Sequence, residues 1–231
     1  MPSSHPRRII ASAKKLALVF AWKVFLVVGP GACSALVPRT PLLAQTTVGT
    51  ETGTPSAAAP ARVLATASRA ERAPVIDGRD DDAAWSASTP IDGFRGFDPV
   101  ENAEPSMRTE ARIVYDAANL YVFVRAFDPH PDSIRSLLSR RDVRTASDQI
   151  KVMIDSYHDR RTGYEFAVNP AGVKRDYYTY DDSQEDVSWD AVWDVSTRID
   201  SLGWTAEFRI PLSQLRYPPA ASHTFGVMII R

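Results

Sequence analysis

Hydrophobic and polar residues alternate with a period of two along most of the chain after residue 108. This period is typical of β-strands that turn one face to a core. It is clearest over 109–115 and 120–127, which the turn-forming residues 116–119 join into a predicted β-hairpin. The same alternation predicts further strands at 150–154, 164–168, 173–179, 193–199, 204–210 and 225–229. Short strands separated by Pro and Gly turns predict an all-β fold, an antiparallel, jelly-roll-like β-sandwich.

One segment departs from the period of two. Residues 132–141 place Ile134, Leu137 and Leu138 on one helical face, and Asp132 or Ser133 is in position to cap the first turn. The sequence therefore predicts one short helix here.

The first 61 residues differ from the rest in composition. A basic head precedes an apolar run over 16–28, which only Lys23 interrupts, and small residues follow up to Ala44. This order is typical of a secretory signal peptide, and the run is shorter than the roughly 20 residues of a membrane span. We expect a signal peptide over 1–44, a disordered linker over 45–61 and a folded domain over 62–231. The protein would then be exported, to the periplasm, the outer membrane or the medium.

Composition and motifs exclude several function classes. The net charge of -1 gives no electrostatic case for nucleic acid as a partner. The one cysteine, Cys33, lies in the predicted leader, so the folded part has no disulfide and no cysteine-based metal site. The sequence contains no phosphate-binding loop and no Gly-x-Ser-x-Gly elbow, and nothing marks out the carboxylate pair of a glycosidase. We therefore expect a protein that is not an enzyme.

Four motifs together resemble the carbohydrate-binding module family 9. Residues 75–85 follow the pattern V-I-D-G-x-x-D-D-x-A-W, and 109–122 follow E-x-R-x-x-Y-D-x-x-x-L-Y-V. Residues 148–155 resemble the family's D-x-x-x-V-x-I-D strand, and 203–211 its G-W-x-x-E-x-x-I-P strand. The resemblance implies a non-catalytic sugar-binding β-sandwich of the type that accompanies glycoside hydrolases in carbohydrate catabolism, often with structural calcium.

A narrower resemblance covers 157–172 and 188–193. These residues are similar to a bacterial subgroup in which the module precedes an outer-membrane barrel-like region. That context leaves an alternative function open, a periplasmic structural or docking domain that meets the barrel and binds no sugar. Because 225–231 is an apolar strand with no closing turn, we expect a truncated gene product.

Aromatic side chains are the first candidates for sugar contact, because a sugar face packs its C–H groups on an aromatic plane. Trp189 lies in a polar loop, where its ring serves either as a loop anchor or as a sugar platform. Tyr178 and Tyr180 share a strand face beside this loop, with Arg175 or Lys174 nearby as a polar rim group. For the tyrosines the alternative is an amphipathic edge strand with exposed rings.

The other tryptophans of the folded part favour core positions. Trp193 alternates with Val195 and Ile199, and we count it among the candidate sugar-binding residues although this alternation favours the core. Trp204 shares a strand face with apolar residues, and Trp85 lies at a junction between turn and strand. We predict that Trp85 and Trp204 are structural.

Two acidic runs are candidates for calcium, which takes about six to eight oxygen ligands. Neither run has the spacing of an EF-hand loop, so a solvated acidic loop is the alternative for both. The first run consists of Asp181, Asp182, Glu185 and Asp186, and the second of Asp77, Asp80, Asp81 and Asp82.

Overall fold

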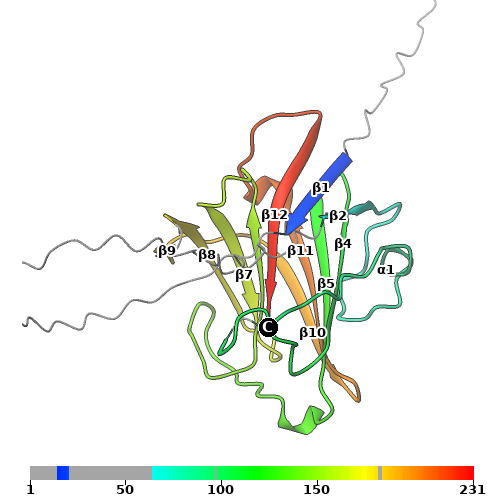
Figure 1. Cartoon of the computed structure of the whole chain (residues 1–231), viewed down its shortest axis with the longest axis vertical. Helices are drawn as coiled ribbons and strands as arrows, with labels where there is room; N and C mark the ends of the chain where they lie inside the picture. Colours follow the sequence, from blue (N-terminus) through cyan, green and yellow to red (C-terminus); the bar gives the residue numbers. More distant parts are fainter. Residues whose placement is uncertain (1–14, 21–63, 97, 182–183) are drawn as a thin grey trace, which may run out of the picture. The chain divides into compact units, whose positions relative to one another are not determined.

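A computed structural model describes residues 15–20, 64–96, 98–181 and 184–231 (Figure 1). They form a seven-stranded sheet A with the strand order β2-β1-β12-β6-β7-β8-β9 and a five-stranded sheet B with the order β10-β11-β5-β4-β3. The strands of sheet A are β1 (Lys15–Phe20), β2 (Leu64–Thr66), β6 (Ile150–Asp155), β7 (Gly163–Val168), β8 (Lys174–Tyr180), β9 (Gln184–Asp186) and β12 (Ser222–Ile230). Those of sheet B are β3 (Ser68–Arg69), β4 (Thr109–Tyr115), β5 (Asn119–Phe127), β10 (Asp194–Asp200) and β11 (Gly203–Pro211).

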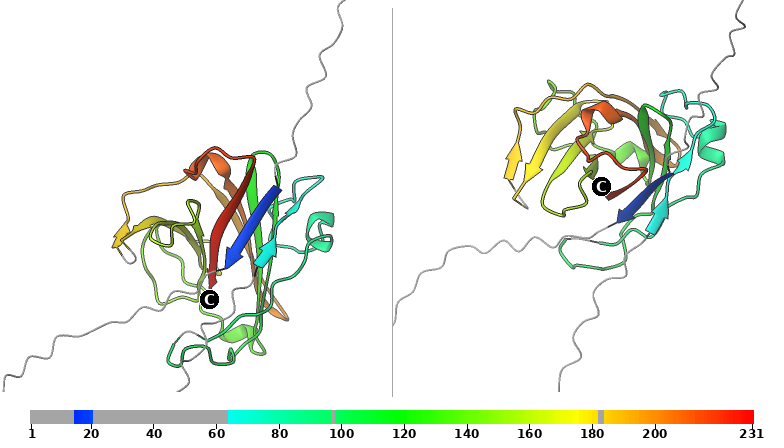
Figure 2. Two further views of the ribbon diagram at one scale, coloured as in Figure 1. Left: turned by 45° about the horizontal axis from the view of Figure 1, so that its top comes forward. Right: turned by 90° about the horizontal axis from the view of Figure 1, so that it is seen from above.

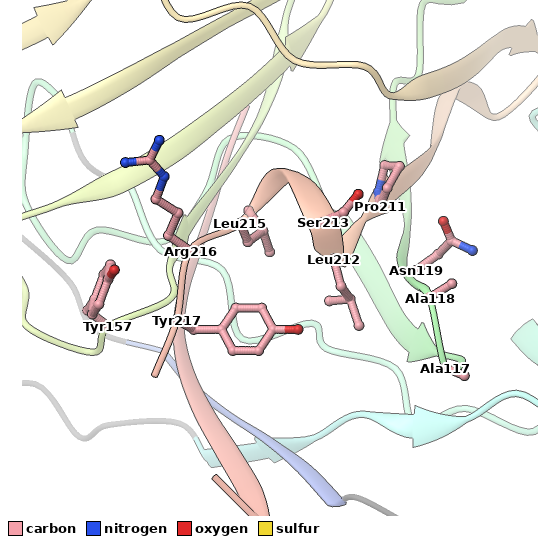
Figure 3. Close-up of a pocket in the computed structure, with 10 residues that line it drawn as sticks. All are labelled: Ala117, Ala118, Asn119, Tyr157, Pro211, Leu212, Ser213, Leu215, Arg216 and Tyr217. Atoms are coloured by element: carbon pink, nitrogen blue, oxygen red, sulfur yellow. The ribbon is translucent and has the colours of Figure 1, made fainter. Parts of the chain in front are cut away.

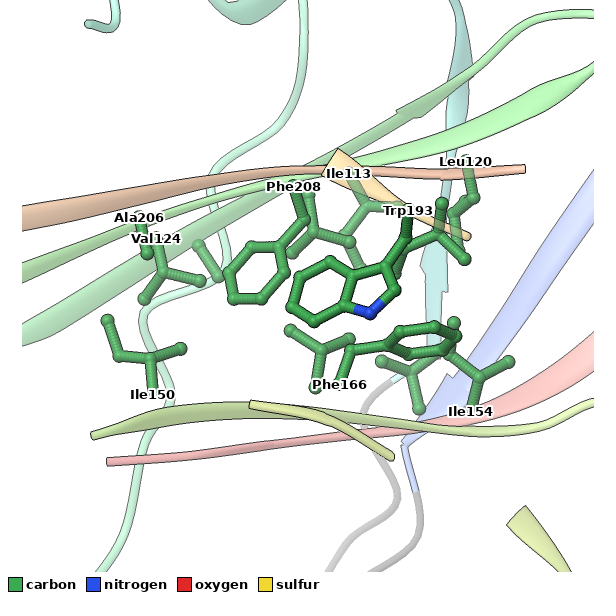
Figure 4. Packing of buried hydrophobic residues seen from close by; sticks show 14 of the residues in the cluster. Ile113, Leu120, Val124, Ile150, Ile154, Phe166, Trp193, Ala206 and Phe208 are labelled. Atoms are coloured by element: carbon green, nitrogen blue, oxygen red, sulfur yellow. The ribbon is translucent and has the colours of Figure 1, made fainter. Parts of the chain in front are cut away.

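The two sheets face each other and enclose one apolar core. Seen end-on in Figure 2, they curve around this core, and Figure 4 shows side chains from both sheets meeting inside it. The predicted β-sandwich is therefore confirmed. Its buried members include Ile113, Leu120, Val124, Ala206 and Phe208 from sheet B and Ile150, Ile154 and Phe166 from sheet A.

The predicted hairpin is β4 and β5, paired antiparallel with Ala111 opposite Val124. The carboxylate of Asp116 holds the turn by accepting hydrogen bonds from the backbone N–H groups of Ala118 and Asn119, both at 2.7 Å. A tight turn also leads into β11, at Gly203. Its φ of 134° is a glycine conformation, and a Cβ atom there would overlap the backbone of Ala126.

The helix predicted for 132–141 is not formed, and this expectation was wrong. The segment contains only the 3-10 turn η1 (Pro131–Ser133), and the one α-helical turn among the described residues is α1 (Ala83–Ser86). The backbone after η1 bonds to distant groups instead of to itself: the N–H of Arg135 reaches Asp148, and that of Asp142 reaches the carbonyl of Lys174. Of the proposed apolar face only Ile134 packs on the core, while Leu137 and Leu138 are 46% and 84% exposed.

Most of the predicted signal peptide and all of the predicted linker lie outside the described residues. The exception is β1, which pairs in parallel with β12 and antiparallel with β2.

Among the described residues, no helix is long and apolar enough to cross a membrane.

A second, smaller core lies on the outer face of sheet B. Trp85, buried at 1% exposure, packs on Phe123 with a ring distance of 5.6 Å. Trp204 is equally buried, in the main core, so both structural predictions are confirmed. The segment that carries Trp85 is held by the buried carboxylate of Glu207, which accepts bonds from the N–H groups of Asp77 (2.9 Å) and Gly78 (2.8 Å) and from Trp85 Nε1 (2.9 Å).

Glu207 should make the stability of the fold depend on pH. Burial raises the pKa of this carboxyl to about 7, although its three N–H donors act in the opposite direction. Because the folded-state pKa lies above the unfolded value of 4.5, its contribution is complete below pH 4.5 and is lost as the pH rises to about 7. We expect the stability difference between the wild type and Glu207→Gln to shrink over this window. Urea denaturation of both proteins at several pH values measures it, and a difference independent of pH would contradict the assignment.

Candidate functional site

Aromatic side chains form a continuous row at the β8–β9 end of sheet A, on the face turned toward sheet B. The ring of Trp189 lies 4.9 Å from that of Tyr164, which lies 5.1 Å from that of Tyr178. Tyr178 then stacks on Tyr180 at 6.4 Å with an interplanar angle of 16°. These four residues are called the aromatic row below. The structure thus brings together the predicted Trp189, Tyr178 and Tyr180 and adds Tyr164.

The strand register explains why these rings meet. Tyr164 of β7 pairs directly with Tyr178 of β8, and Tyr180 follows two residues later on the same face. The row passes from the core to the surface, because Tyr164 is buried, Tyr178 and Trp189 are half-buried, and Tyr180 is 41% exposed. Trp189 lies in the 187–193 loop between β9 and β10, where it packs on the core. Its ring is therefore both a loop anchor and a partly accessible surface.

Trp193 does not belong to the accessible surface, and its candidacy as a sugar ligand is corrected. It is 1% exposed and stacks on Phe208 of sheet B at 5.8 Å, with the two rings 7° from parallel. Lys174 covers it, donating to the Trp193 carbonyl at 2.7 Å. The alternation with Val195 and Ile199 had favoured this core position.

Arg175 also lies away from the row, on the opposite face of β8. Its guanidinium sits 5.3 Å from the ring of Tyr177, and the residue is only 7% exposed. Residues at odd positions of this strand point away from Tyr178 and Tyr180, which excludes Arg175 as a rim donor for these rings.

A buried carboxylate fixes the loop that carries Trp189. Asp176, on the same strand face as Tyr178, accepts hydrogen bonds from the N–H of Ala191 (2.7 Å), Nε1 of Trp193 (3.1 Å) and the guanidinium of Arg141 (2.6 Å). Arg141 also donates to the carbonyl of Ala191 at 2.9 Å and pairs with Asp190 at 2.6 Å. Burial lowers the pKa of Arg141, but the hydrogen bond and charge of Asp176 outweigh it, and the pKa ends above its ordinary value. The Asp176–Arg141 pair therefore ties β8 to the 187–193 loop.

Replacing Arg141 with glutamine should destabilise the domain by about 2–3 kcal/mol, because it leaves the buried Asp176 without its cation. Glycan affinity should fall with it, since the loop loses its links to Arg141. Arg144→Gln is the matched control: Arg144 lies in the same segment but is exposed and pairs with the surface residue Glu185, so the cost should stay below about 0.5 kcal/mol. Urea denaturation of both variants measures the difference. Equal costs would show that the pair does not hold the loop.

The two acidic runs do not present a calcium site in the described residues. Asp182 lies outside them, and no group of three or more carboxylate, histidine or cysteine side chains gathers among those described. In the first run, Asp181 lies 3.5 Å from Arg161, Glu185 lies 3.2 Å from Arg144, and Asp186 accepts a bond from Ser188. In the second, Asp77 accepts from the N–H of Arg79, Asp80 lies 3.7 Å from Arg125, and Asp82 accepts from the N–H of Val75. The described residues do not fit the calcium that the family resemblance implies.

Sequence reasoning missed Tyr164, Asp176 and Arg141. Tyr164 had been read only as a strand residue, and no single sequence reveals its register against β8. Asp176 could have been noticed in the sequence. Alternation along the strand places it on the same face as the large side chains of Tyr178 and Tyr180. Arg141 was missed because residues 132–141 were wrongly predicted to form a helix.

Comparison with known proteins gives a match to one family and weaker similarities to solved structures. None of the curated proteins matches this chain significantly. Similar solved structures include a carbohydrate binding module family 9 from Caldicellulosiruptor kristjanssonii in complex with cellotriose, at 20% identity over 66% of this chain and 68% of that chain, with a TM-score of 0.46. The same module in complex with glucose is 22% identical over 66% of this chain and 70% of that one, also with a TM-score of 0.46.

The family itself is established by the sequence match. Residues 76–231, more than half of the chain, match the family model described as carbohydrate family 9 binding domain-like. This match begins inside the 75–85 motif and covers all strands from β4 to β12. The chain therefore belongs to the carbohydrate family 9 binding domain-like family.

Proposed function

We propose that this protein is a non-catalytic carbohydrate-binding module of an exported protein, of the type associated with glycoside hydrolases. Its sugar platform is the exposed side of the aromatic row, formed by Trp189, Tyr178 and Tyr180. Family membership supports the binding function, and the row supports the location.

The single observation that carries the location is the contact chain from Trp189 through Tyr164 and Tyr178 to Tyr180. Aromatic planes that begin in the core and end at the surface offer a rigid apolar support for the C–H face of a sugar ring. Neighbouring polar groups can then bond the hydroxyls, although each such bond adds only about 0.5–1.5 kcal/mol net in water. Stacking on the rings would therefore supply most of the affinity.

A binding measurement tests the proposal directly. The full chain is titrated calorimetrically with neutral and acidic oligosaccharides, cellotriose among them, and tryptophan fluorescence is followed in parallel. We expect binding accompanied by a change in tryptophan emission, because Trp189 is the half-buried tryptophan of the described chain. Absence of binding to every glycan at millimolar concentration would refute the carbohydrate function.

The docking alternative would be favoured by a broad apolar patch or by an unpaired final strand. β12 pairs with β6 on one side and with β1 on the other, and β1 lies inside the predicted signal peptide. Cleavage after Ala44 would remove β1 and open that edge of β12, so the glycan titration decides between the two functions.

Export rests on the basic head and the apolar run of the N-terminal sequence. N-terminal sequencing of the protein from separated cell fractions should find a mature start at Gln45 outside the cytoplasm. A cytoplasmic protein that begins at Met1 would contradict export without touching the binding function.

A further inference from the structure

A hollow of about 740 Å³ lies close to the aromatic row and is not used by it. Three segments surround it: the turn between β4 and β5, the 156–162 loop between β6 and β7, and the 211–217 segment that contains the 3-10 turn η2 (Leu212–Gln214). Figure 3 shows Tyr157 and Arg216 on one side of the hollow and Asn119 on the other, with Tyr217 and Leu212 between them.

Contacts with neighbouring residues fix the position of the side chains and loops that line the hollow. Tyr217 packs on Phe225 of the core at 5.3 Å and on His223 at 4.7 Å. In the 156–162 loop, the carboxylate of Asp155 accepts bonds from the N–H groups of Asp159 and Arg160. The hollow is thus a shallow depression, open to solvent and lined by the rings of Tyr157 and Tyr217, on which a sugar ring can pack.

Exposed arginines and one exposed carboxylate lie on the segments around the hollow, and the carboxylate, Asp159, accepts bonds from the N–H groups of Arg161 and Thr162. Arg216 is exposed, and its guanidinium has no hydrogen-bond or ion-pair partner among the described residues. Arg160, in the neighbouring loop, is likewise exposed and has no carboxylate partner in the described part of the chain. The carboxylate of Asp116, behind the opposite wall, is occupied by the N–H of Ala118 and the hydroxyl of Tyr121, both at 2.7 Å.

The hollow is contiguous with the aromatic row. The backbone N–H of Arg216 donates to the hydroxyl of Tyr164 at 3.4 Å, and the hydroxyl of Ser156 donates to the Arg216 carbonyl at 2.5 Å. On the other side, the N–H of Val192, in the loop of Trp189, donates to Gln214 at 3.1 Å. Arg216 is therefore a direct neighbour of Tyr164, and a glycan that continues from the exposed rings of the row across the buried Tyr164 would reach it.

We propose that this hollow is a subsite for a sugar residue that bears a carboxylate, a uronic acid, and that Arg216 is the specificity-determining residue. This inference rests on the proposed sugar-binding function and names the class of glycan, an acidic oligosaccharide. The guanidinium of Arg216 matches a carboxylate in two parallel charge-assisted hydrogen bonds, which hydroxyl groups do not replace.

The test compares tetragalacturonate with cellotetraose by titration calorimetry on the full chain. The two glycans have equal length but differ in linkage and ring configuration as well as in charge, so the Arg216 variants isolate the effect of the carboxylates. At low ionic strength the wild type should bind the uronate about tenfold more tightly than the neutral glycan, and added salt should reduce the difference. Arg216→Gln should remove this preference while leaving cellotetraose affinity unchanged, and Arg216→Lys should retain part of it. Arg79→Gln, on the outer side of sheet B with an exposed side chain, removes the same charge elsewhere and should have no effect.

The outcomes separate this inference from the proposed function. If the wild type binds cellotetraose as tightly as tetragalacturonate, or if Arg216→Gln keeps the preference, the acidic subsite is refuted and sugar binding stands. If Arg79→Gln lowers the preference as much as Arg216→Gln, the effect belongs to net charge, and the subsite is again refuted. If neither glycan binds, the binding function itself fails.

Discussion

Replacing Glu207 with alanine is expected to remove most of the stability of the fold, at a cost of about 3–6 kcal/mol. The change leaves three donors without an acceptor, the part-buried N–H of Asp77 and the buried N–H of Gly78 and Nε1 of Trp85. Each such orphaned donor costs about 1–3 kcal/mol, and domains of this size are stable by only about 5–15 kcal/mol. Urea denaturation near pH 4.5, where the contribution of Glu207 is still present, followed by tryptophan fluorescence, measures the loss.

Glu104→Ala is the matched control for this prediction. Glu104 is 84% exposed and pairs with Arg95 on the surface, so its loss should change the unfolding free energy by less than about 0.5 kcal/mol. Similar values for the two variants would contradict the role of Glu207. A large loss in Glu207→Ala, with a protein that still binds sugar at low temperature, would place the residue in the scaffold and not in the site.

This bond network gives a physical reason for two motifs on which the family resemblance was based. The motif at 75–85 supplies the turn and Trp85, and the motif at 203–211 supplies Glu207 and also Thr205, whose hydroxyl donates to the Gly78 carbonyl at 2.6 Å. The two segments are about 130 positions apart in the chain and meet on the outer face of sheet B. These residues fix the 75–85 segment to the outer face of sheet B, and none of them belongs to the aromatic row.

The strands were predictable because their signal is local. Alternation along β4, β5 and β11 reflects one face in the main core, and the observed bounds differ from the expected ones by only a residue or two. The helix prediction failed because Ile134, Leu137 and Leu138 satisfy helical spacing by chance. The backbone N–H groups of Arg135, Leu137 and Asp142 bond instead to Asp148, Ser147 and β8. A local pattern carries no information about such partners.

The candidate site was predictable only in part, because it depends on register. Alternation of side chains along the strand places Tyr178 and Tyr180 on one face. The same alternation places Arg175 on the opposite face, away from these rings. Tyr164 enters through the pairing of β7 with β8, and Trp189 through a loop position set by Asp176. Strand register and loop position depend on residues that are far apart in the sequence. A single sequence therefore predicts the kinds of residue in the site but does not identify all of them.

Replacing Trp189 with alanine should lower glycan affinity by about 1.5–3 kcal/mol, which is about 10- to 150-fold. The indole ring is the largest surface of the aromatic row, and its removal takes away the plane on which the sugar packs. Because the ring also packs on Tyr164 and Phe166, at 4.9 and 5.8 Å, the change should cost the fold about 1–2 kcal/mol. Titration calorimetry and urea denaturation of the same preparations separate the two losses.

Two further variants show which role of Trp189 dominates. Val192→Ala alters a 77% exposed residue of the same loop and should change neither binding nor stability. Trp189→Phe retains an aromatic plane, so it should recover part of the affinity while keeping the packing on Tyr164. Unchanged glycan affinity in Trp189→Ala would show that the sugar platform lies elsewhere in the fold. Loss of binding that appears only where the protein has unfolded would identify Trp189 as a loop anchor, because a sugar platform must lose affinity in a protein that is still folded.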